Sequence, residues 1–149
     1  VLASHPPPTA RDTAWAMSEE NVEIVRRFVA AFTAGDMDAF MTFFADDAVV
    51  QTDPSFPEGG TLVGPEAIRR FHEGLHEGWR GGGEVVAKDF RAASDRVFAS
   101  IVWTAIGEAS RIETSSQWYL VFRLRDGKIA RLRYFRDQSD ALEAAGLRE

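Results

Sequence analysis

The side chains of this sequence that could do chemistry are an aspartate before a proline and two histidines one helical turn apart. Asp53 precedes Pro54 at the expected end of a strand, and His72 and His76 bound the segment HEGLH. A carboxylate surrounded by aromatic side chains is destabilised in its charged form, so its pKa rises toward the range useful for moving a carbon-bound proton. A neutral imidazole can donate to a carbonyl oxygen or shuttle a proton. Asp53 as general base and His72 as donor therefore predict acid/base catalysis.

Each of these residues also has a purely structural interpretation. Aspartate before proline is common turn chemistry at the end of a strand, and it requires no substrate. A histidine on the apolar face of a helix is commonly satisfied by a backbone group. Both interpretations of Asp53 and His72 stay open at the level of the sequence.

The segment from His72 to His76 also matches H-E-x-x-H, the pattern in which two histidines bind zinc and the glutamate acts as general base. A catalytic zinc needs a third protein ligand. The other histidine, His5, lies near the N-terminus, so that ligand would be an acid such as Asp53 or Glu77. Zinc-dependent hydrolysis through His72 and His76 is therefore a minority alternative, and the leading prediction includes no metal and no cofactor.

Composition excludes several other classes of protein. The 149 residues suit one domain, the absence of cysteine excludes disulfides and thiolate chemistry, and a net charge of −6 disfavours binding to nucleic acid. No apolar stretch approaches the roughly 18 residues needed to cross a bilayer, so we expect a cytoplasmic protein. With 11 Phe and 4 Trp but 2 Tyr, the aromatic residues are mostly apolar and predict a hydrophobic interior or pocket.

The beginning of the chain differs from the rest. Residues 1–16 contain consecutive prolines and no apolar run, so we expect a flexible extension there. Ser18 can cap a helix, and the acids that follow it suit a first helical turn. The folded domain is therefore expected over residues 17–149.

Apolar spacing and turn residues predict helices first and strands afterwards. Helices are expected from Ser18 to Gly35, from Asp36 to Asp46 and from Pro65 to the triple glycine that begins at Gly81. Strands are expected at 48–52, 84–92, 96–106, 112–124 and 128–135, with a last short helix at 139–145. This order predicts an α+β domain in which three N-terminal helices pack on one face of a curved antiparallel sheet, forming a cone with a pocket.

Several local strings resemble the nuclear transport factor 2-like superfamily, which has a cystatin-like fold, and within it the SnoaL-like proteins. The resemblance covers about residues 17–149 and lies in ENVE at 20–23, AGD at 34–36, FADDAV at 44–49, GPEAI at 64–68, RDGKI at 125–129 and ALEAAGL at 141–147. It implies the same cone-shaped fold, a pocket for a small molecule and a homodimer through the exposed face of the sheet. The superfamily includes isomerases, cyclases, dehydratases, hydrolases and non-catalytic binders, so these strings identify a fold rather than an activity.

The resemblance to ketosteroid isomerase implies where a site would lie and which reaction is disfavoured. Asp53 matches the position of that enzyme's general base, and His72 matches an aromatic hydroxyl of its hydrogen-bond network. Phe28 and Leu120 stand where that enzyme has its oxyanion donors, and neither side chain can donate a hydrogen bond. Steroid isomerisation is therefore disfavoured.

Limonene epoxide hydrolase, another similar enzyme, is disfavoured for the same kind of reason. Its Arg and Asp positions correspond in this chain to Val102, Thr104 and Tyr134, so the hydrolase machinery is missing.

The same resemblance, with strand alternation, divides the sheet into two faces. It puts on the inner face Ser100, Val102, Thr104, Trp118, Leu120, Phe122, Leu132, Tyr134 and Arg136. It puts on the outer face, where they could serve a dimer, Trp103, Gln117, Tyr119, Arg131, Arg133 and Phe135. A shift of one residue would exchange the two faces of a strand.

We therefore predict a hydrophobic pocket that performs acid/base catalysis, of an isomerase, cyclase or dehydratase type, on a small cyclic or polyketide-like carbonyl compound. The predicted catalytic residues are Asp53, His72 and Tyr134. The predicted ligand-binding residues are Phe28, Trp79, Val102, Trp118, Leu120 and Arg136. The alternative is a non-catalytic protein that binds an apolar small metabolite. The expected partners are a small apolar or aromatic molecule and a second copy of the chain, with no nucleic acid and no membrane.

Overall fold

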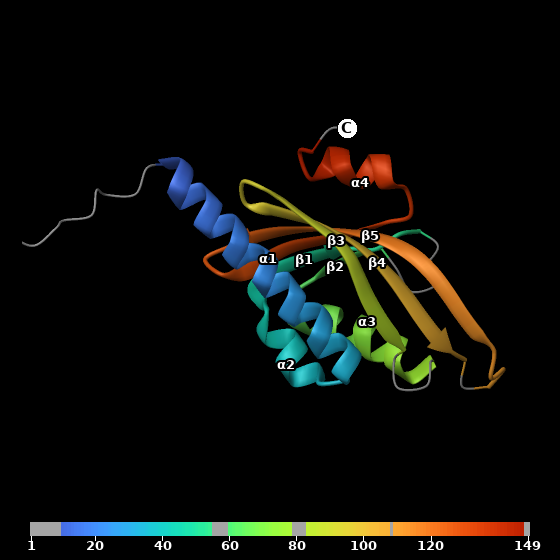
Figure 1. Ribbon diagram of the computed structural model, residues 1–149. Helices are drawn as coiled ribbons and strands as arrows, with labels where there is room; N and C mark the ends of the chain where they lie inside the picture. The colour runs from blue at the N-terminus through green and yellow to red at the C-terminus, as the bar shows by residue number, and fades with distance from the viewer. Residues whose placement is uncertain (1–9, 55–59, 79–82, 108, 148–149) are drawn as a thin grey trace, which may run out of the picture.

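One curved, unclosed sheet with helices on both of its faces organises the protein (Figure 1). The computed structural model describes residues 10–54, 60–78, 83–107 and 109–147. The helices are α1 (Ala10–Ala34), α2 (Met37–Thr42), α3 (Pro65–Gly78) and α4 (Gln138–Ala144). The strands are β1 (Phe44–Gln51), β2 (Thr61–Val63), β3 (Glu84–Ala93), β4 (Arg96–Ile106), β5 (Glu113–Arg125) and β6 (Lys128–Phe135).

The strands lie in the order β2-β1-β6-β5-β4-β3. β3 to β6 form the antiparallel meander that the sequence predicts, and Asp126 and Gly127 make its last turn with left-handed φ angles of 51° and 75°. β1 pairs with β6 in parallel, with Val50 opposite Leu132. β2 is a short edge strand that the sequence analysis did not predict. The predicted α+β class is confirmed.

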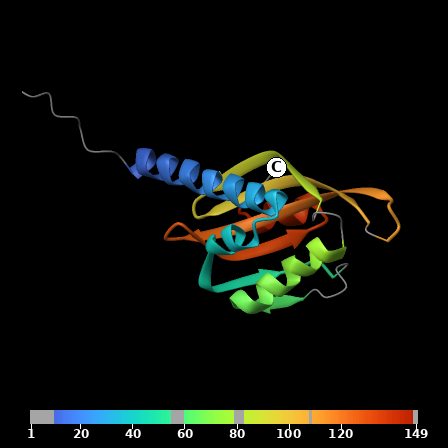
Figure 2. The same ribbon diagram turned by 90° about the horizontal axis from the view of Figure 1, so that it is seen from below.

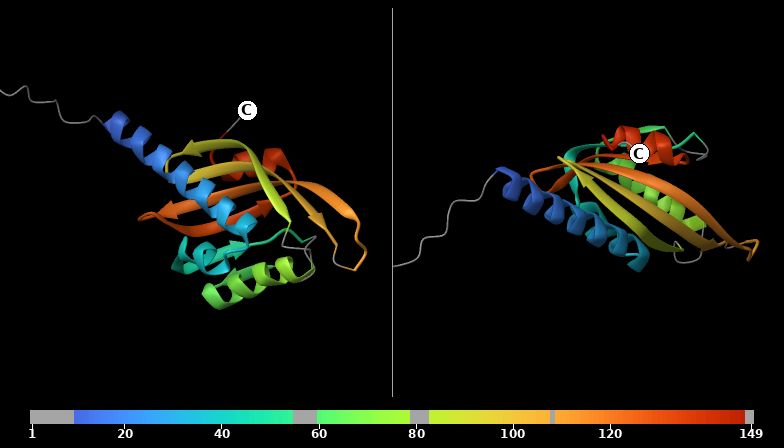
Figure 3. Two further views of the ribbon diagram at one scale, coloured as in Figure 1. Left: turned by 60° about the horizontal axis from the view of Figure 1, so that its bottom comes forward. Right: turned by 45° about the horizontal axis from the view of Figure 1, so that its top comes forward.

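The helices occupy opposite sides of the sheet. Figures 2 and 3 show α1, α2 and α3 against its concave face, while α4 lies alone on the other side. Buried side chains form a separate core under each layer. The expectation that the N-terminal helices cover one face is therefore confirmed.

The first helix begins earlier than predicted. α1 starts at Ala10 instead of Ser18, so the part of the expected flexible extension from residue 10 to 16 is helical; residues 1–9 lie outside the described residues. The physical reason is intrinsic propensity, because alanine-rich sequence upstream of Ser18 favours helix continuation over capping. The helix ends as predicted before Gly35, whose φ is 73°.

The first strand also begins earlier than predicted. β1 starts at Phe44 rather than Ala48, so Asp46 and Asp47 belong to the strand and do not end α2. Phe44 lies opposite Ile129 of β6. Pairing with a strand far along the chain thus overrides the local turn preference of two aspartates.

The core beneath the first three helices is rich in phenylalanine. The rings of Phe28 and Phe40 stack at 4.4 Å, and Phe28 meets Phe44 and Phe122 edge to face at 5.4 Å. Each fully buried phenylalanine stabilises the fold by about 1.5–3 kcal/mol. This cluster fixes α1 and α2 on the sheet and forms one wall of the cavity described next.

Among the helices that the structure describes, none combines the length and apolarity required of a membrane span.

Candidate ligand-binding site

A cavity of about 50 Å³ lies between α1, α2, α3 and the concave face of the sheet. Its lining is formed by Phe28, Val29, Phe32, Phe40, Leu75, Val85, Ile101, Trp103, Trp118, Leu120 and Tyr134. The lining is almost entirely apolar, and Tyr134 contributes the one hydroxyl among these side chains. A largely apolar cavity with one hydroxyl suits a small apolar ligand that makes few hydrogen bonds.

The predicted inner face is right for β5 and β6 and wrong for β4. Trp118, Leu120 and Tyr134 line the cavity as expected, but from β4 the residues that line it are Ile101 and Trp103. Ile101 lies directly opposite Trp118, which places both on one face.

Val102 therefore points to the outer face and is not among the residues that line the cavity, so its role in ligand binding stays a prediction. Its partner across the strands is Gln117, whose side-chain amide donates to the Ser100 hydroxyl and to the Ile101 carbonyl oxygen. Alternation does not distinguish the two faces of β4, because apolar residues occupy both of them. On the outer face, the second core, beneath α4, buries Phe98.

His72 is the buried polar group beside the cavity. α3 places it with 1% of its surface exposed, between the rings of Phe40 and Phe71 at 4.8 and 5.0 Å. Its Nδ1 lies 2.8 Å from the Ile68 carbonyl oxygen, and its Nε2 lies 2.8 Å from the Tyr134 hydroxyl.

These two contacts define the direction of both hydrogen bonds. A carbonyl oxygen can only accept, so Nδ1 of His72 carries the proton and donates to Ile68. A neutral imidazole then has an unprotonated Nε2, which accepts the proton of the Tyr134 hydroxyl. Both ring nitrogens of His72 are thus engaged inside the protein, as the structural interpretation of this residue expects.

Burial keeps both partners neutral. Desolvation lowers the pKa of His72 from 6.5 to about 4, partly offset by its bond to Ile68 and reinforced by His76. Desolvation also raises the pKa of the Tyr134 phenol well above its ordinary value. The pair therefore holds a neutral imidazole and a neutral phenol at physiological pH.

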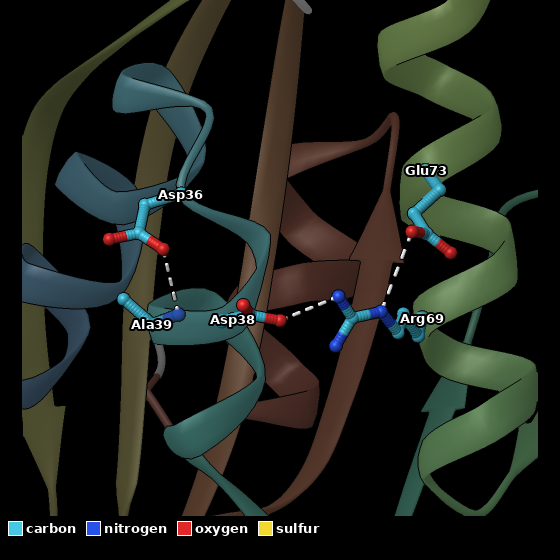
Figure 4. A network of polar contacts seen from close by, with 5 residues as sticks. All are labelled: Asp36, Asp38, Ala39, Arg69 and Glu73. Atoms are coloured by element: carbon cyan, nitrogen blue, oxygen red, sulfur yellow. Dashed lines mark hydrogen bonds and ion pairs between the residues drawn. The ribbon is translucent and has the colours of Figure 1, made fainter.

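A surface contact links α3 to α2. Asp36 caps α2 by accepting from the Ala39 backbone N–H at 3.1 Å. The Arg69 guanidinium reaches Asp38 at 2.7 Å and Glu73 at 3.4 Å, as Figure 4 shows. These groups are exposed, so solvent screens both pairs and they contribute little to stability.

Arg136 lies outside the cavity lining. Its guanidinium carbon is 4.4 Å from the centre of the Trp118 ring, and its Nη1 donates to the Gln117 carbonyl oxygen at 3.1 Å. The Trp118 indole N–H donates in turn to the Ser116 hydroxyl at 3.0 Å. Arg136 therefore packs on the indole that forms the cavity wall.

Asp53 lies at the end of β1, half-buried, and is not among the residues that line the cavity. The neighbouring Thr52 is buried, and its hydroxyl and backbone N–H both donate to the Gly60 carbonyl oxygen. The catalytic role of Asp53 stays a prediction. Trp79, a predicted ligand contact, falls outside the described residues.

The zinc alternative through His72 and His76 is wrong. No group of three histidine, cysteine or acidic side chains in the described ranges is placed to hold a metal ion. Both nitrogens of His72 are occupied by Ile68 and Tyr134, while the His76 ring packs against Phe32 at 4.8 Å. The H-E-x-x-H pattern here is a consequence of helical packing.

Sequence reasoning missed part of the cavity wall. Val85 and Trp103 come from strands whose facing residues depend on register, which no local signal reveals. Phe32, Phe40 and Leu75 lie on the predicted apolar stripes of the helices, and that periodicity could have named them.

Three helices over a concave, open sheet that encloses an apolar cavity define the ketosteroid isomerase-like, nuclear transport factor 2-like class of α+β proteins. Residues 25–132 match the SnoaL-like domain family, so the chain belongs to the SnoaL-like family. The resemblance proposed from the sequence is confirmed.

Solved structures support the same fold. Bal32a, from a soil-derived mobile gene cassette, is 27% identical with a TM-score of 0.71, over 87% of this chain and 98% of that one. A ketosteroid isomerase-like protein from Catenulispora acidiphila, in complex with trimethylamine, is 22% identical with a TM-score of 0.68, over 85% and 94%. A Mycobacterium tuberculosis protein in complex with estradiol-17β-hemisuccinate is 16% identical with a TM-score of 0.68, over 80% and 95%.

Proposed function

We propose that the cavity binds a small apolar molecule that carries a hydroxyl or another hydrogen-bond donor. The observation that supports this is the Tyr134–His72 pair beside an otherwise apolar wall. The Tyr134 proton is directed to His72, so the phenol oxygen meets a ligand as an acceptor. Such an acceptor prefers an alcohol, phenol or enol to a carbonyl oxygen.

The size of the cavity also restricts the ligand. At about 50 Å³, the space admits a small molecule without rearrangement, and a larger one requires side chains of the lining to move. The structurally similar proteins that hold trimethylamine and estradiol-17β-hemisuccinate show that this fold accommodates ligands of very different size. A small ring with one hydroxyl is the class that fits the cavity here.

Phenol and toluene test this proposal, because they differ by the hydroxyl that Tyr134 would accept. Titrations followed by tryptophan fluorescence are expected to show tighter binding of phenol, and Tyr134→Phe is expected to abolish that preference. Tyr119→Phe is the matched control, since Tyr119 packs with the outer core beneath α4. Equal affinities in the wild type, or a preference that survives Tyr134→Phe, would contradict the proposal.

Acid/base catalysis on a cyclic carbonyl compound is the second candidate. The position of Asp53, half-buried at the end of β1, supports it, and Tyr134 would contact the substrate. Asp53→Asn is then expected to abolish turnover of a substrate while leaving its binding and the folding of the protein unchanged. If native mass spectrometry shows a bound metabolite that is released chemically unchanged, the binding function is favoured instead.

The homodimer through the outer face and the cytoplasmic location are also proposals. Gln117, Tyr119 and Phe135 lie on that face, as predicted, with Tyr119 and Phe135 against the core beneath α4. Sedimentation velocity of the full chain tests the dimer, and fractionation of the native cell tests the location.

A further inference from the structure

Arginines form a row across the outer face of the sheet. Arg96 of β4 lies opposite Arg123 of β5, and Arg123 lies opposite Arg131 of β6. Arg133 follows two positions along β6, on the same face, opposite Val121. Like charges directly opposite each other on paired strands are destabilising, so this row is unfavourable unless something offsets its charge.

Acidic groups of the described residues offset little of the positive charge of this row. Arg123 pairs with Asp95 at 3.1 Å, and among the described residues this is the ion pair that the row makes. The other guanidiniums have neutral partners. Arg96 donates to the Ala144 carbonyl oxygen at 2.9 Å and Arg131 to the Gln51 side chain at 3.2 Å.

The guanidinium of Arg133 is partly buried and lies near two other positive charges. Its guanidinium carbon lies 4.8 Å from the centre of the Phe135 ring. Its pKa is lowered by partial burial first, and then by the positive charges of Arg131 and Arg96. An anion placed among these groups would reverse that effect.

The row encloses a hollow. A cavity of about 90 Å³ between the end of α4 and the strands is lined by Arg96, Val121, Arg123, Arg131, Arg133 and Ala144. Guanidinium groups present planar pairs of N–H donors that match phosphate oxygens. The chain as a whole carries a net charge of −6, so this positive region is local and suits a small anion rather than a nucleic acid.

We propose that this hollow binds a phosphate group, as free phosphate or as the phosphate ester of a small molecule, through Arg96, Arg131 and Arg133. The site lies across the sheet from the apolar cavity and is independent of the function proposed for that cavity. Arg123 contributes less, because its charge is already balanced by Asp95.

Titration of the full-length protein with inorganic phosphate and pyrophosphate tests the site. At ionic strength held constant with chloride, both are expected to shift backbone amide resonances of β4, β5 and β6 in a saturable way and to raise the melting temperature. Pyrophosphate, with more charge, is expected to bind more tightly. Acetate at the same concentration is the control for a general effect of anions, and comparable binding of acetate would overturn the assignment to phosphate.

Arg131→Gln is the variant that should weaken the site. Removing one charge-assisted pair of hydrogen bonds is expected to reduce pyrophosphate affinity about tenfold. Arg27→Gln on α1 removes the same charge from an exposed residue that pairs with Glu23 of its own helix, and it should change the affinity by less than about twofold. Equal affinity in the two variants would overturn the proposal.

Two further measurements define the source of the phosphate. Tighter binding of phenyl phosphate than of inorganic phosphate would indicate an ester, and the reverse would indicate free phosphate; both support the site. The proposal would be overturned if neither compound binds in a saturable way and if sedimentation velocity shows a dimer that Arg131→Gln dissociates. In that case the acids of a second copy of the chain cover the row of arginines.

Discussion

The two faces of the sheet differ in the charge of their polar side chains, although the same strands form both faces. On the concave face, His72 and Tyr134 are a neutral histidine and a neutral phenol that bond to each other. On the outer face, guanidiniums stand in a row and keep their charge. Burial makes the difference: desolvation removes the charge of a histidine at modest cost, whereas an arginine stays charged in proteins and needs a counter-ion.

This comparison teaches that strand alternation alone separates two kinds of binding surface. Tyr134 and Arg133 are neighbours in sequence, yet one lines an apolar cavity and the other a positively charged hollow. A one-residue change of register in β6 would exchange them. The cores beneath α1–α3 and beneath α4 both fix that register, because each buries one side of the same strands.

The largest expected effect comes from weakening the core beneath α1, α2 and α3. Phe122 is fully buried beneath the helices, so Phe122→Ala is expected to lower the free energy of unfolding by about 3–5 kcal/mol. Phe135→Ala is the matched control on the other face, where the ring is half-buried, and it should cost less. Urea unfolding measures both, and an equal loss would contradict the greater importance of the inner core.

The next effect depends on pH and belongs to the concave face alone. Because the pKa of His72 falls from 6.5 to about 4 on folding, the unfolded chain binds a proton between these values that the native protein does not. The stability that the neutral His72 contributes is thus fully present above pH 6.5. It is lost as the pH falls to 4, which lowers the free energy of unfolding by on the order of 3 kcal/mol.

Urea unfolding at several pH values measures this loss of stability. His72→Gln is expected to flatten the pH dependence of the free energy of unfolding, whereas Arg131→Gln, on the outer face, is expected to leave it unchanged. An unchanged pH dependence in His72→Gln would show that other groups cause the acid destabilisation.

A smaller effect is expected where a glycine packs against the cavity wall. An added Cβ at Gly83 would lie 2.7 Å from Nε1 of Trp103 and 2.6 Å from the Thr104 carbonyl oxygen, and its φ is 81°. Gly83→Ala is expected to destabilise the protein by about 2 kcal/mol and to change the fluorescence of Trp103.

Gly146→Ala is the control for this variant. Its φ is 77°, but no atom lies within 4 Å of an added Cβ. It should cost about 1 kcal/mol, from backbone conformation alone, and leave tryptophan fluorescence unchanged. A similar change of fluorescence in both variants would contradict the contact between Gly83 and the indole.

The smallest effect is expected at the surface link between α2 and α3. Arg69→Ala removes exposed pairs with Asp38 and Glu73, so it should lower the free energy of unfolding only slightly, and by less still at high salt. Phenol affinity should be unchanged, because His72 is held by the core. A large loss of affinity would show that these contacts, rather than packing, position the histidine.

Much of the architecture could be predicted because its signals are local. Gly35 ends a helix, Asp36 caps the next, and Asp126-Gly127 forms a hairpin turn, each through its own backbone conformation or side chain. β4 and β6 have the predicted bounds, because alternation and turns delimit them.

The remaining features depend on pairings between distant residues. The inner face of β4 could not be assigned, since Ile101 and Val102 are equally apolar and only the partner Trp118 distinguishes them. Arg131 and Arg133 were correctly expected on the outer face. Their alignment with Arg96 required the register of three strands, which the sequence does not contain in local form.

The parallel pairing of β1 with β6 has a consequence for how the protein is made. β6 is the last strand of the chain, yet it lies in the middle of the sheet, between β1 and β5. During synthesis, the edge of β1 that pairs with β6 therefore stays unpaired until residues 128–135 have left the ribosome. Such late, long-range closure slows folding and prolongs exposure of apolar surface, so nascent chains that end before Lys128 are expected to aggregate or to occupy chaperones.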